Sequence, residues 1–114
     1  MKKIALVALS LTFSASAFAA GNIEAGKVAA AKFNCASCHG ANYNEPIDPS
    51  YPKLAGQHKD YLVNALKAYQ RGAVGTAGRS NAIMEAQAKA LSNADIENIS
   101  AYFASLKGSL VLKK

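Results

Sequence analysis

The pattern of hydrophobic and polar positions predicts an all-α protein, because apolar residues recur at helical spacing and no stretch alternates as a β-strand would. The last helix is the clearest. Ser92 and Asp95 form a capping-box pattern with the shorter acid in place of glutamate, and Lys107 and Gly108 mark the end of the helix. The apolar stripe of this helix consists of Ile96, Ile99, Phe103 and Leu106.

A first helix and a long loop are expected in the N-terminal half of the chain. Asn22 is a suitable N-cap for a helix that ends near Phe33. Its apolar stripe is expected to comprise Ile23, Gly26, Ala30 and Phe33. The following loop, residues 40–54, contains three prolines, which exclude a continuous helix.

A middle helix is expected from Gln57 or Asp60 to Arg71, just before a glycine that provides a C-terminal stop. Its apolar face carries Leu62, Leu66 and Tyr69. Residues 72–81 contain three glycines and form a second loop, and a short helical turn is expected over residues 83–91. Loops of this length in a compact domain usually serve a function.

The first 19 residues have the features of a secretory signal peptide. Two lysines provide the positive charge, residues 4–13 the apolar stretch, and Ala17 and Ala19 the small-residue cleavage pattern. An uncleaved membrane anchor is the alternative, but the apolar run is short against the roughly 20 residues that span a bilayer. We therefore expect residues 1–19 to be removed and residues 20–114 to form one domain.

Composition and charge add two constraints. A domain of this size buries a small core, and this chain has no tryptophan, so another group is expected to fill its centre. The formal net charge of +6 becomes +4 without the two signal-peptide lysines. No dense Lys/Arg block is present and export disfavours nucleic acid as a partner, so the charge points weakly to acidic protein surfaces.

The segment Cys35–His39 reads Cys-Ala-Ser-Cys-His, which is the attachment pattern for a c-type haem. Two cysteines three positions apart can form thioethers with the two vinyl groups along one haem edge. The next residue, His39, then lies beside the ring, where its imidazole can bind the iron. Cys35 and Cys38 are the only cysteines of the chain, and one covalent haem would also be the group that fills the core.

Three other interpretations of these cysteines compete: a structural disulfide, a thioredoxin-like redox pair and a zinc site. The redox pair requires a βαβ pattern nearby, which the sequence lacks. The ligands available for zinc would be Cys35, Cys38, His39 and His58. Adjacent Cys38 and His39 are awkward for tetrahedral binding, whereas export and the core-poor helical composition favour haem.

The second axial ligand determines the chemistry of the iron. Residues 20–114 contain one methionine, Met84, and one further histidine, His58. A thioether favours ferrous iron and raises the reduction potential, and His/Met is the pair used by cytochromes c. Met84 follows a Gly-rich loop and could reach the face opposite His39, so we expect His39 and Met84 as the iron ligands. The alternatives are a core-filling Met84 and a bis-histidine site with His58.

With these residues in place, the chain resembles a class I cytochrome c of the short bacterial periplasmic type over nearly all of residues 20–114. The resemblance rests on Gly26, residues 35–40, residues 51–57, Met84 and residues 101–103. It implies the cytochrome c fold, with three main helices, short helical turns and long loops around one covalent haem. It also implies that the first and last helices cross, with Gly26 close to Tyr102 or Phe103.

The resemblance further implies contacts around the haem. The carbonyl of Pro52 is implied to accept the imidazole N–H of His39, although Pro49 could take this part. The tryptophan that some relatives place near a haem propionate is missing here. The candidates for that position are Tyr51, Tyr61 and Arg79.

The function that this resemblance implies is one-electron transfer in the periplasm, by a monomer that is not an enzyme and that meets membranes only through its partners. The implied donor is a quinol–cytochrome c oxidoreductase, and the implied acceptor is a terminal oxidase, a peroxidase or another reductase. The alternative is a haem subunit dedicated to a periplasmic oxidoreductase complex. A sensor or catalyst with a vacant iron position is a third hypothesis, which Met84 argues against.

Overall fold

The computed structural model describes residues 5, 7, 8, 10, 21–73 and 78–109. The helices of this part are α1 (Ile23–Lys32), α2 (Ala36–His39), α3 (Lys59–Arg71), α4 (Ala82–Lys89) and α5 (Asn93–Ser105). The described residues contain no strand, so the all-α prediction is confirmed for them. None of their helices has the length and apolar character needed to cross a membrane. The predicted signal peptide lies largely outside the described residues.

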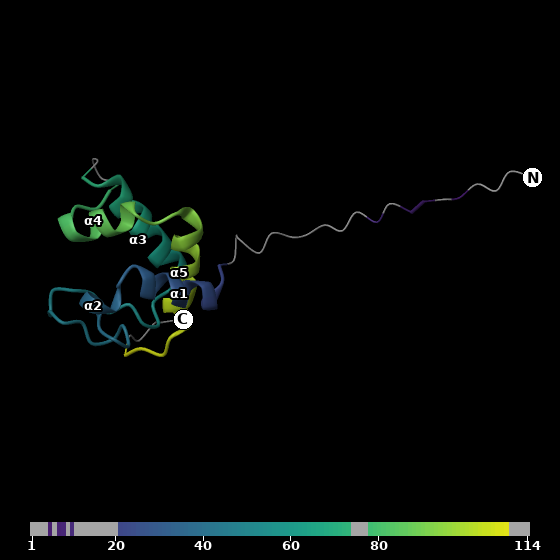
Figure 1. Cartoon of the computed structure of the whole chain (residues 1–114). Coiled ribbons are helices and arrows are strands. Elements are labelled where there is room, and N and C mark those ends of the chain that lie inside the picture. The colour runs from purple at the N-terminus through teal and green to yellow at the C-terminus, as the bar shows by residue number, and fades with distance from the viewer. Residues whose placement is uncertain (1–4, 6, 9, 11–20, 74–77, 110–114) are drawn as a thin grey trace, which may run out of the picture.

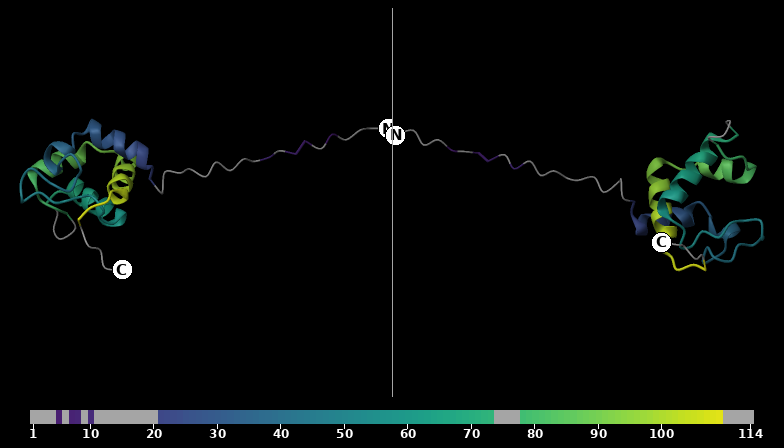
Figure 2. Two further views of the ribbon diagram at one scale, coloured as in Figure 1. Left: turned by 90° about the horizontal axis from the view of Figure 1, so that it is seen from below. Right: turned by 180° about the vertical axis from the view of Figure 1, so that it is seen from behind.

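Two branches extend from a pair of crossed helices (Figures 1 and 2). Helices α1 and α5 form the pair. One branch holds α2 and the loop of residues 40–54, and the other holds α3 and α4. The chain thus places the Cys35–His39 motif in one branch and Met84 in the opposite one.

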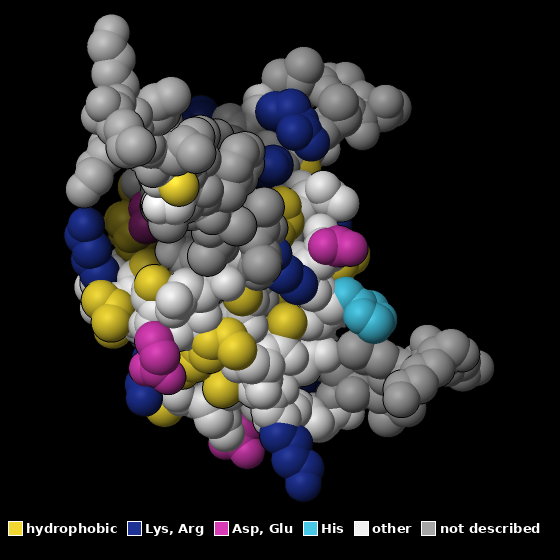
Figure 3. Space-filling view, turned by 90° about the vertical axis from the view of Figure 1, so that its right-hand side faces the viewer, with side chains coloured by type: hydrophobic (Ala, Val, Ile, Leu, Met, Phe, Trp, Pro, Cys, Tyr) yellow, Lys and Arg dark blue, Asp and Glu magenta, His cyan; other side chains and the backbone are white. Residues whose placement is uncertain are grey.

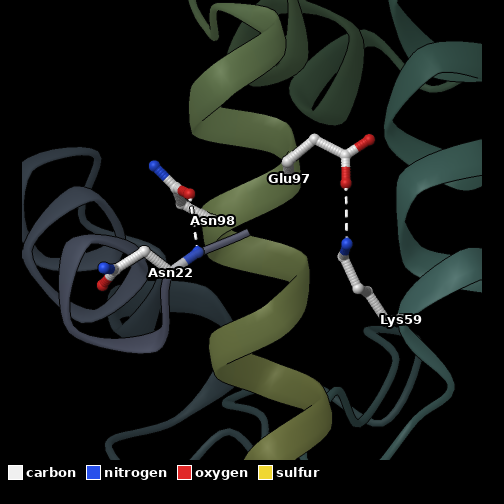
Figure 4. Close-up of polar contacts among 4 residues, drawn as sticks. All are labelled: Asn22, Lys59, Glu97 and Asn98. Carbon is white, nitrogen blue, oxygen red and sulfur yellow. Dashed lines mark hydrogen bonds and ion pairs between the residues drawn. The ribbon is translucent and has the colours of Figure 1, made fainter. Parts of the chain in front are cut away.

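The crossing of α1 and α5 depends on a glycine. A Cβ atom at Gly26 would overlap the carbonyl oxygen of Asn98 and would lie 2.8 Å from Cβ of Tyr102. The backbone N–H of Asn22 also donates to Oδ1 of Asn98 at 2.8 Å, which ties the start of α1 to α5 (Figure 4). The predicted close approach at Gly26 is therefore confirmed, with Tyr102 as the aromatic neighbour.

Helix α3 packs on α5 from the other side. Leu62 and Val63 of α3 are buried, and Nζ of Lys59 lies 2.8 Å from Oε2 of Glu97 (Figure 4). The start of α5 has the predicted capping box, because the Ser92 hydroxyl accepts from the Asp95 backbone and the Asp95 carboxylate accepts from the Ser92 backbone. Helix α5 is thus capped at its start and packs against α1 and α3 along its length.

The core is small. The largest fully buried side chains among the described residues are Ile96, Ile99 and Ser100. The aromatic part of the core consists of Tyr43 and Phe103, whose ring centroids are 4.5 Å apart. The expectation that the polypeptide alone builds only a modest core agrees with this packing.

Three details differ from the sequence-based expectations. In the expected stripe of α1, Gly26 and Ala30 are buried and Phe33 packs on the core, but Ile23 is 48% exposed and the third buried residue is Ala29. The Cys35–His39 motif itself forms a short helix, α2, which the pattern did not predict. The expected turn at residues 83–91 is a helix of eight residues that begins at Ala82.

The charged side chains do not gather into one patch on the face that Figure 3 shows. Lysine and arginine side chains are scattered there among hydrophobic, acidic and uncharged groups. This distribution over the described part of that face agrees with the absence of a dense Lys/Arg block in the sequence.

Candidate haem site

A cavity lies between the two branches of the fold. Its volume is about 200 Å³, whereas a cavity that holds one water molecule needs only about 10–15 Å³. Most of its lining is hydrophobic and includes Phe33, Leu54, Leu62, Leu66, Leu91 and Phe103. All four predicted site residues also line it, namely Cys35, Cys38, His39 and Met84.

The short helix α2 explains how the motif presents three groups together. The backbone N–H of His39 donates to the carbonyl of Cys35 at 3.1 Å. Residues three and four positions apart lie on the same side of a helix, so Cys35, Cys38 and His39 share one side of α2. Gly40 then ends the helix with φ of +92°, where a Cβ would overlap the carbonyl of Glu45. The helical turn therefore directs the attachment residues toward the cavity.

Both thiols are free. Burial raises the pKa of the Cys35 thiol above its ordinary value, against a backbone hydrogen bond that lowers it. The pair is thus not a disulfide in this structure. Among the described residues no group of three or more His, Cys, Asp or Glu side chains is arranged to hold a metal ion.

His39 is buried and oriented. Its Nδ1 lies 2.9 Å from the carbonyl oxygen of Pro52. A carbonyl only accepts, so Nδ1 carries the proton and the lone pair is on Nε2. Such a contact fixes the tautomer and the ring orientation of a metal-ligating histidine. The expected contact with Pro52 is confirmed.

Met84 lies in the first turn of α4, within the stretch where a helical turn was expected. The side-chain oxygen of Asn81 caps this helix by accepting from the backbone N–H groups of Ile83 at 3.1 Å and Met84 at 3.0 Å. The Met84 side chain is partly buried and lines the cavity from the branch opposite to His39. It also lines a second, smaller cavity of about 90 Å³, again together with His39.

The guanidinium of Arg79 lies at the same cavity, against the side chains of Tyr61 and Tyr69. Nη2 of Arg79 donates to the hydroxyl of Tyr61 at 3.2 Å. Its guanidinium lies 5.4 Å from the ring centroid of Tyr61 and 5.6 Å from that of Tyr69. These contacts, with the Tyr61 hydrogen bond first, raise the pKa of Arg79.

The three residues proposed from the sequence for a propionate contact therefore lie at two different cavities. Tyr61 and Arg79 line the main cavity, whereas Tyr51 lines only the smaller one, with its ring centroid 6.5 Å from that of His39. Tyr69 joins Arg79 but was missed, although its spacing of two helical turns from Tyr61 indicates the same side of α3. His58 is exposed, forms the N-cap of α3 and does not line the cavity.

These features fit a haem. The apolar cavity would enclose a flat hydrophobic group, and two thiols lie on the same helix as an imidazole with a free nitrogen. On the opposite branch, the thioether of Met84 is a suitable second ligand for iron. Arg79 and the hydroxyl of Tyr61 are suitable partners for the two propionate carboxylates of a haem.

The chain belongs to the cytochrome c family, because residues 23–107 match the sequence profile of the family described as cytochrome c. Membership in this family implies a covalently attached c-type haem. The chain is 39% identical over 113 residues to cytochrome c4 of Stutzerimonas stutzeri, which covers 96% of this chain and 52% of that protein. It is also 37% identical over 76 residues to a protein of Thiomonas intermedia named thiosulfate dehydrogenase electron acceptor, which covers 67% of this chain and 33% of that protein.

The fold agrees with these sequence relations. The crystal structure of reduced recombinant cytochrome c4 from Pseudomonas stutzeri matches 80% of this chain and 48% of that chain, with a TM-score of 0.70 and 40% sequence identity. The chain spans about half the length of the cytochrome c4 relatives that it matches. The expected class and fold, a cytochrome c, are confirmed.

Proposed function

We propose that this protein is a one-electron carrier with one c-type haem, attached to Cys35 and Cys38 and ligated by His39 and Met84. The observation that carries the proposal is that all four of these side chains line the same apolar cavity. When bound, the haem supplies an iron that alternates between the ferrous and ferric states.

The polypeptide tunes and shields this centre. The Pro52 carbonyl accepts a hydrogen bond from Nδ1–H of His39, which makes the ring a stronger electron donor. The neutral, soft thioether of Met84 favours the ferrous state and raises the reduction potential. His39 is buried at the end of α2, and Met84 lies on α4, which packs on α3, so the fold itself positions both proposed ligands.

If His39 and Met84 both hold the iron, no position on it would be left for a substrate, so we propose that the protein carries electrons and is not an enzyme. The proposed donor is a quinol–cytochrome c oxidoreductase, and the proposed acceptors are a terminal oxidase, a peroxidase or another reductase. The relative in Thiomonas intermedia that is named an electron acceptor supports a carrier role.

Residues 1–19 are proposed to be a cleaved signal peptide that sends a monomer to the periplasm. Sequencing the N-terminus of the protein recovered from the periplasmic fraction tests this. A chain that starts at Ala20 is expected, whereas a chain that starts at Met1 in the membrane fraction would replace the carrier with an anchored form.

The test of the haem centre is a set of visible spectra of the protein produced with haem-maturation machinery, together with a denaturing gel stained for haem. Sharp bands on reduction, haem that stays with the polypeptide and a weak far-red band in the oxidised protein are expected. The matched control is the double variant Cys35→Ala/Cys38→Ala, which should give no haem stain. Covalent haem without the far-red band would contradict Met84 as a ligand, and wild-type protein without haem would contradict the whole proposal.

A further inference from the structure

Helix α4 holds the proposed ligand Met84, yet it has only eight residues. Isolated helices of this length are not stable in water, so α4 depends on its neighbours. It packs on α3. The place of Met84 relative to His39 is therefore determined by how firmly α4 is held on α3.

One main-chain hydrogen bond and the side chain of Gln70 connect this region to α3. The backbone N–H of Arg79, just before α4, donates to the carbonyl of Ala68 at 3.0 Å. At the other end, Nε2 of Gln70 donates to the carbonyl of Ala88 at 2.9 Å and to that of Leu91 at 3.0 Å. One amide group thus binds the Ala88 carbonyl in the last turn of α4, which also accepts from the backbone N–H of Leu91 at 3.1 Å, and the Leu91 carbonyl just beyond the helix.

The carbonyl of Ala88 belongs to the helical turn that follows Met84. Ala88 is fully buried and lines the same cavity as Met84, one turn further along α4. Gln70 itself lines neither cavity. Its amide can therefore influence the site through α4 without any contact to a bound group.

We infer that Gln70 is a positioning residue for Met84: its two hydrogen bonds hold α4 on α3 and so keep the methionine sulfur on the iron. This inference rests on the proposed ligation by His39 and Met84. Loss of the amide would leave both carbonyls without this donor and let α4 move away from α3, which would weaken the sulfur–iron bond without changing the haem contacts.

The test is a titration of the oxidised holoprotein with imidazole, which competes with Met84 for the iron, followed through the far-red band. In the variant Gln70→Met, which keeps the side-chain length but removes the donor, imidazole is expected to bind about tenfold more tightly, a factor typical of one lost buried hydrogen bond. The matched control Asn64→Met changes an exposed amide of the same helix and should leave the affinity unchanged. Gln70→Lys retains a donor and should stay within about threefold of wild type.

A far-red band in wild type combined with an unchanged imidazole affinity in Gln70→Met would overturn the inference alone, even if the variant unfolds at a lower temperature. A wild-type protein without the far-red band would overturn Met84 ligation and the inference with it. Should Gln70→Met fail to yield folded holoprotein, Gln70→Asn, whose shorter amide cannot span the same distance, is titrated in its place with the same two outcomes.

Discussion

At the scale of single residues, Met84 is the proposed ligand on which we expect the reduction potential of the centre to depend most. Of the two proposed ligands, His39 belongs to a local motif, whereas Met84 comes from the opposite branch of the fold. Replacing a thioether by a weaker ligand or by water removes its preference for ferrous iron. The chemistry of the site therefore changes at this residue without any change in haem attachment.

Met84→Ala is expected to lower the reduction potential by about 100 mV or more, within the range of about 0.8 V that axial ligands span. It is also expected to let the reduced protein bind carbon monoxide. A redox titration and a carbon monoxide difference spectrum measure both effects. Met84→His serves as the control, because it should lower the potential yet keep carbon monoxide out. An unchanged potential in Met84→Ala would contradict the assignment.

Tyr43 is expected to make the stability of the folded protein depend on pH. Burial raises the pKa of its phenol above the ordinary value of 10.0, with smaller contributions from Cys35 and Tyr102. The folded state therefore holds this proton more tightly than the unfolded chain. Stability from this residue is present below about pH 10 and is lost as the pH rises above it.

Denaturant midpoints of wild type and Tyr43→Phe between about pH 8 and 11 test this effect. The wild-type midpoint is expected to fall more steeply above about pH 10 than that of the variant, because the variant has no phenol to ionise. Parallel curves would show that other groups cause the alkaline loss of stability.

Whole helices depend on the crossing at Gly26. In an isolated helix, replacing glycine by alanine stabilises by about 1 kcal/mol. Here the added methyl group would overlap the backbone carbonyl of Asn98, which no rotamer change can relieve. Overpacking of this kind costs about 1–3 kcal/mol or more, so the sign of the effect reverses.

Gly26→Ala is accordingly expected to lower the free energy of unfolding by about 2 kcal/mol in chemical denaturation of the holoprotein. Val28→Ala is the control, because Val28 is 69% exposed on the same helix and its replacement should change stability by less than about 0.5 kcal/mol. A stabilised Gly26→Ala protein would mean that α1 and α5 do not cross as closely as described.

Local sequence patterns predict some of these helices and miss others. Helices α1, α3 and α5 followed from apolar periodicity and from caps such as Asn22 and Ser92, which are local signals. Helix α2 has only four residues, too few for any period to show, and α4 was foreseen only as a turn. The attachment motif was readable because its residues are adjacent in sequence. The choice of Pro52 over Pro49 and the contact of Gln70 with α4 depend on the path of the chain, which no local pattern contains.

The molecule as a whole is built around a space that its own side chains do not fill. The core residues are mostly alanine, leucine and isoleucine, and the cavity of about 200 Å³ is lined mainly by apolar groups. The net free energy of unfolding of a native protein is only about 5–15 kcal/mol, so we expect the haem to be needed for stability as well as for redox chemistry.

The chain without haem, produced as Cys35→Ala/Cys38→Ala, is therefore expected to keep part of its helical far-ultraviolet signal but to lose a cooperative thermal transition and its near-ultraviolet signal. Calorimetry and circular dichroism of this variant beside the holoprotein measure the difference. The contacts of α1 with α5 at Gly26 need no haem, so residual helix should concentrate there. If the variant instead unfolds cooperatively within a few degrees of the holoprotein, the crossed helices and α3 form a self-sufficient core. The cavity would then exist for binding alone, and its apolar lining would reflect the control of reduction potential and not the stability of the fold.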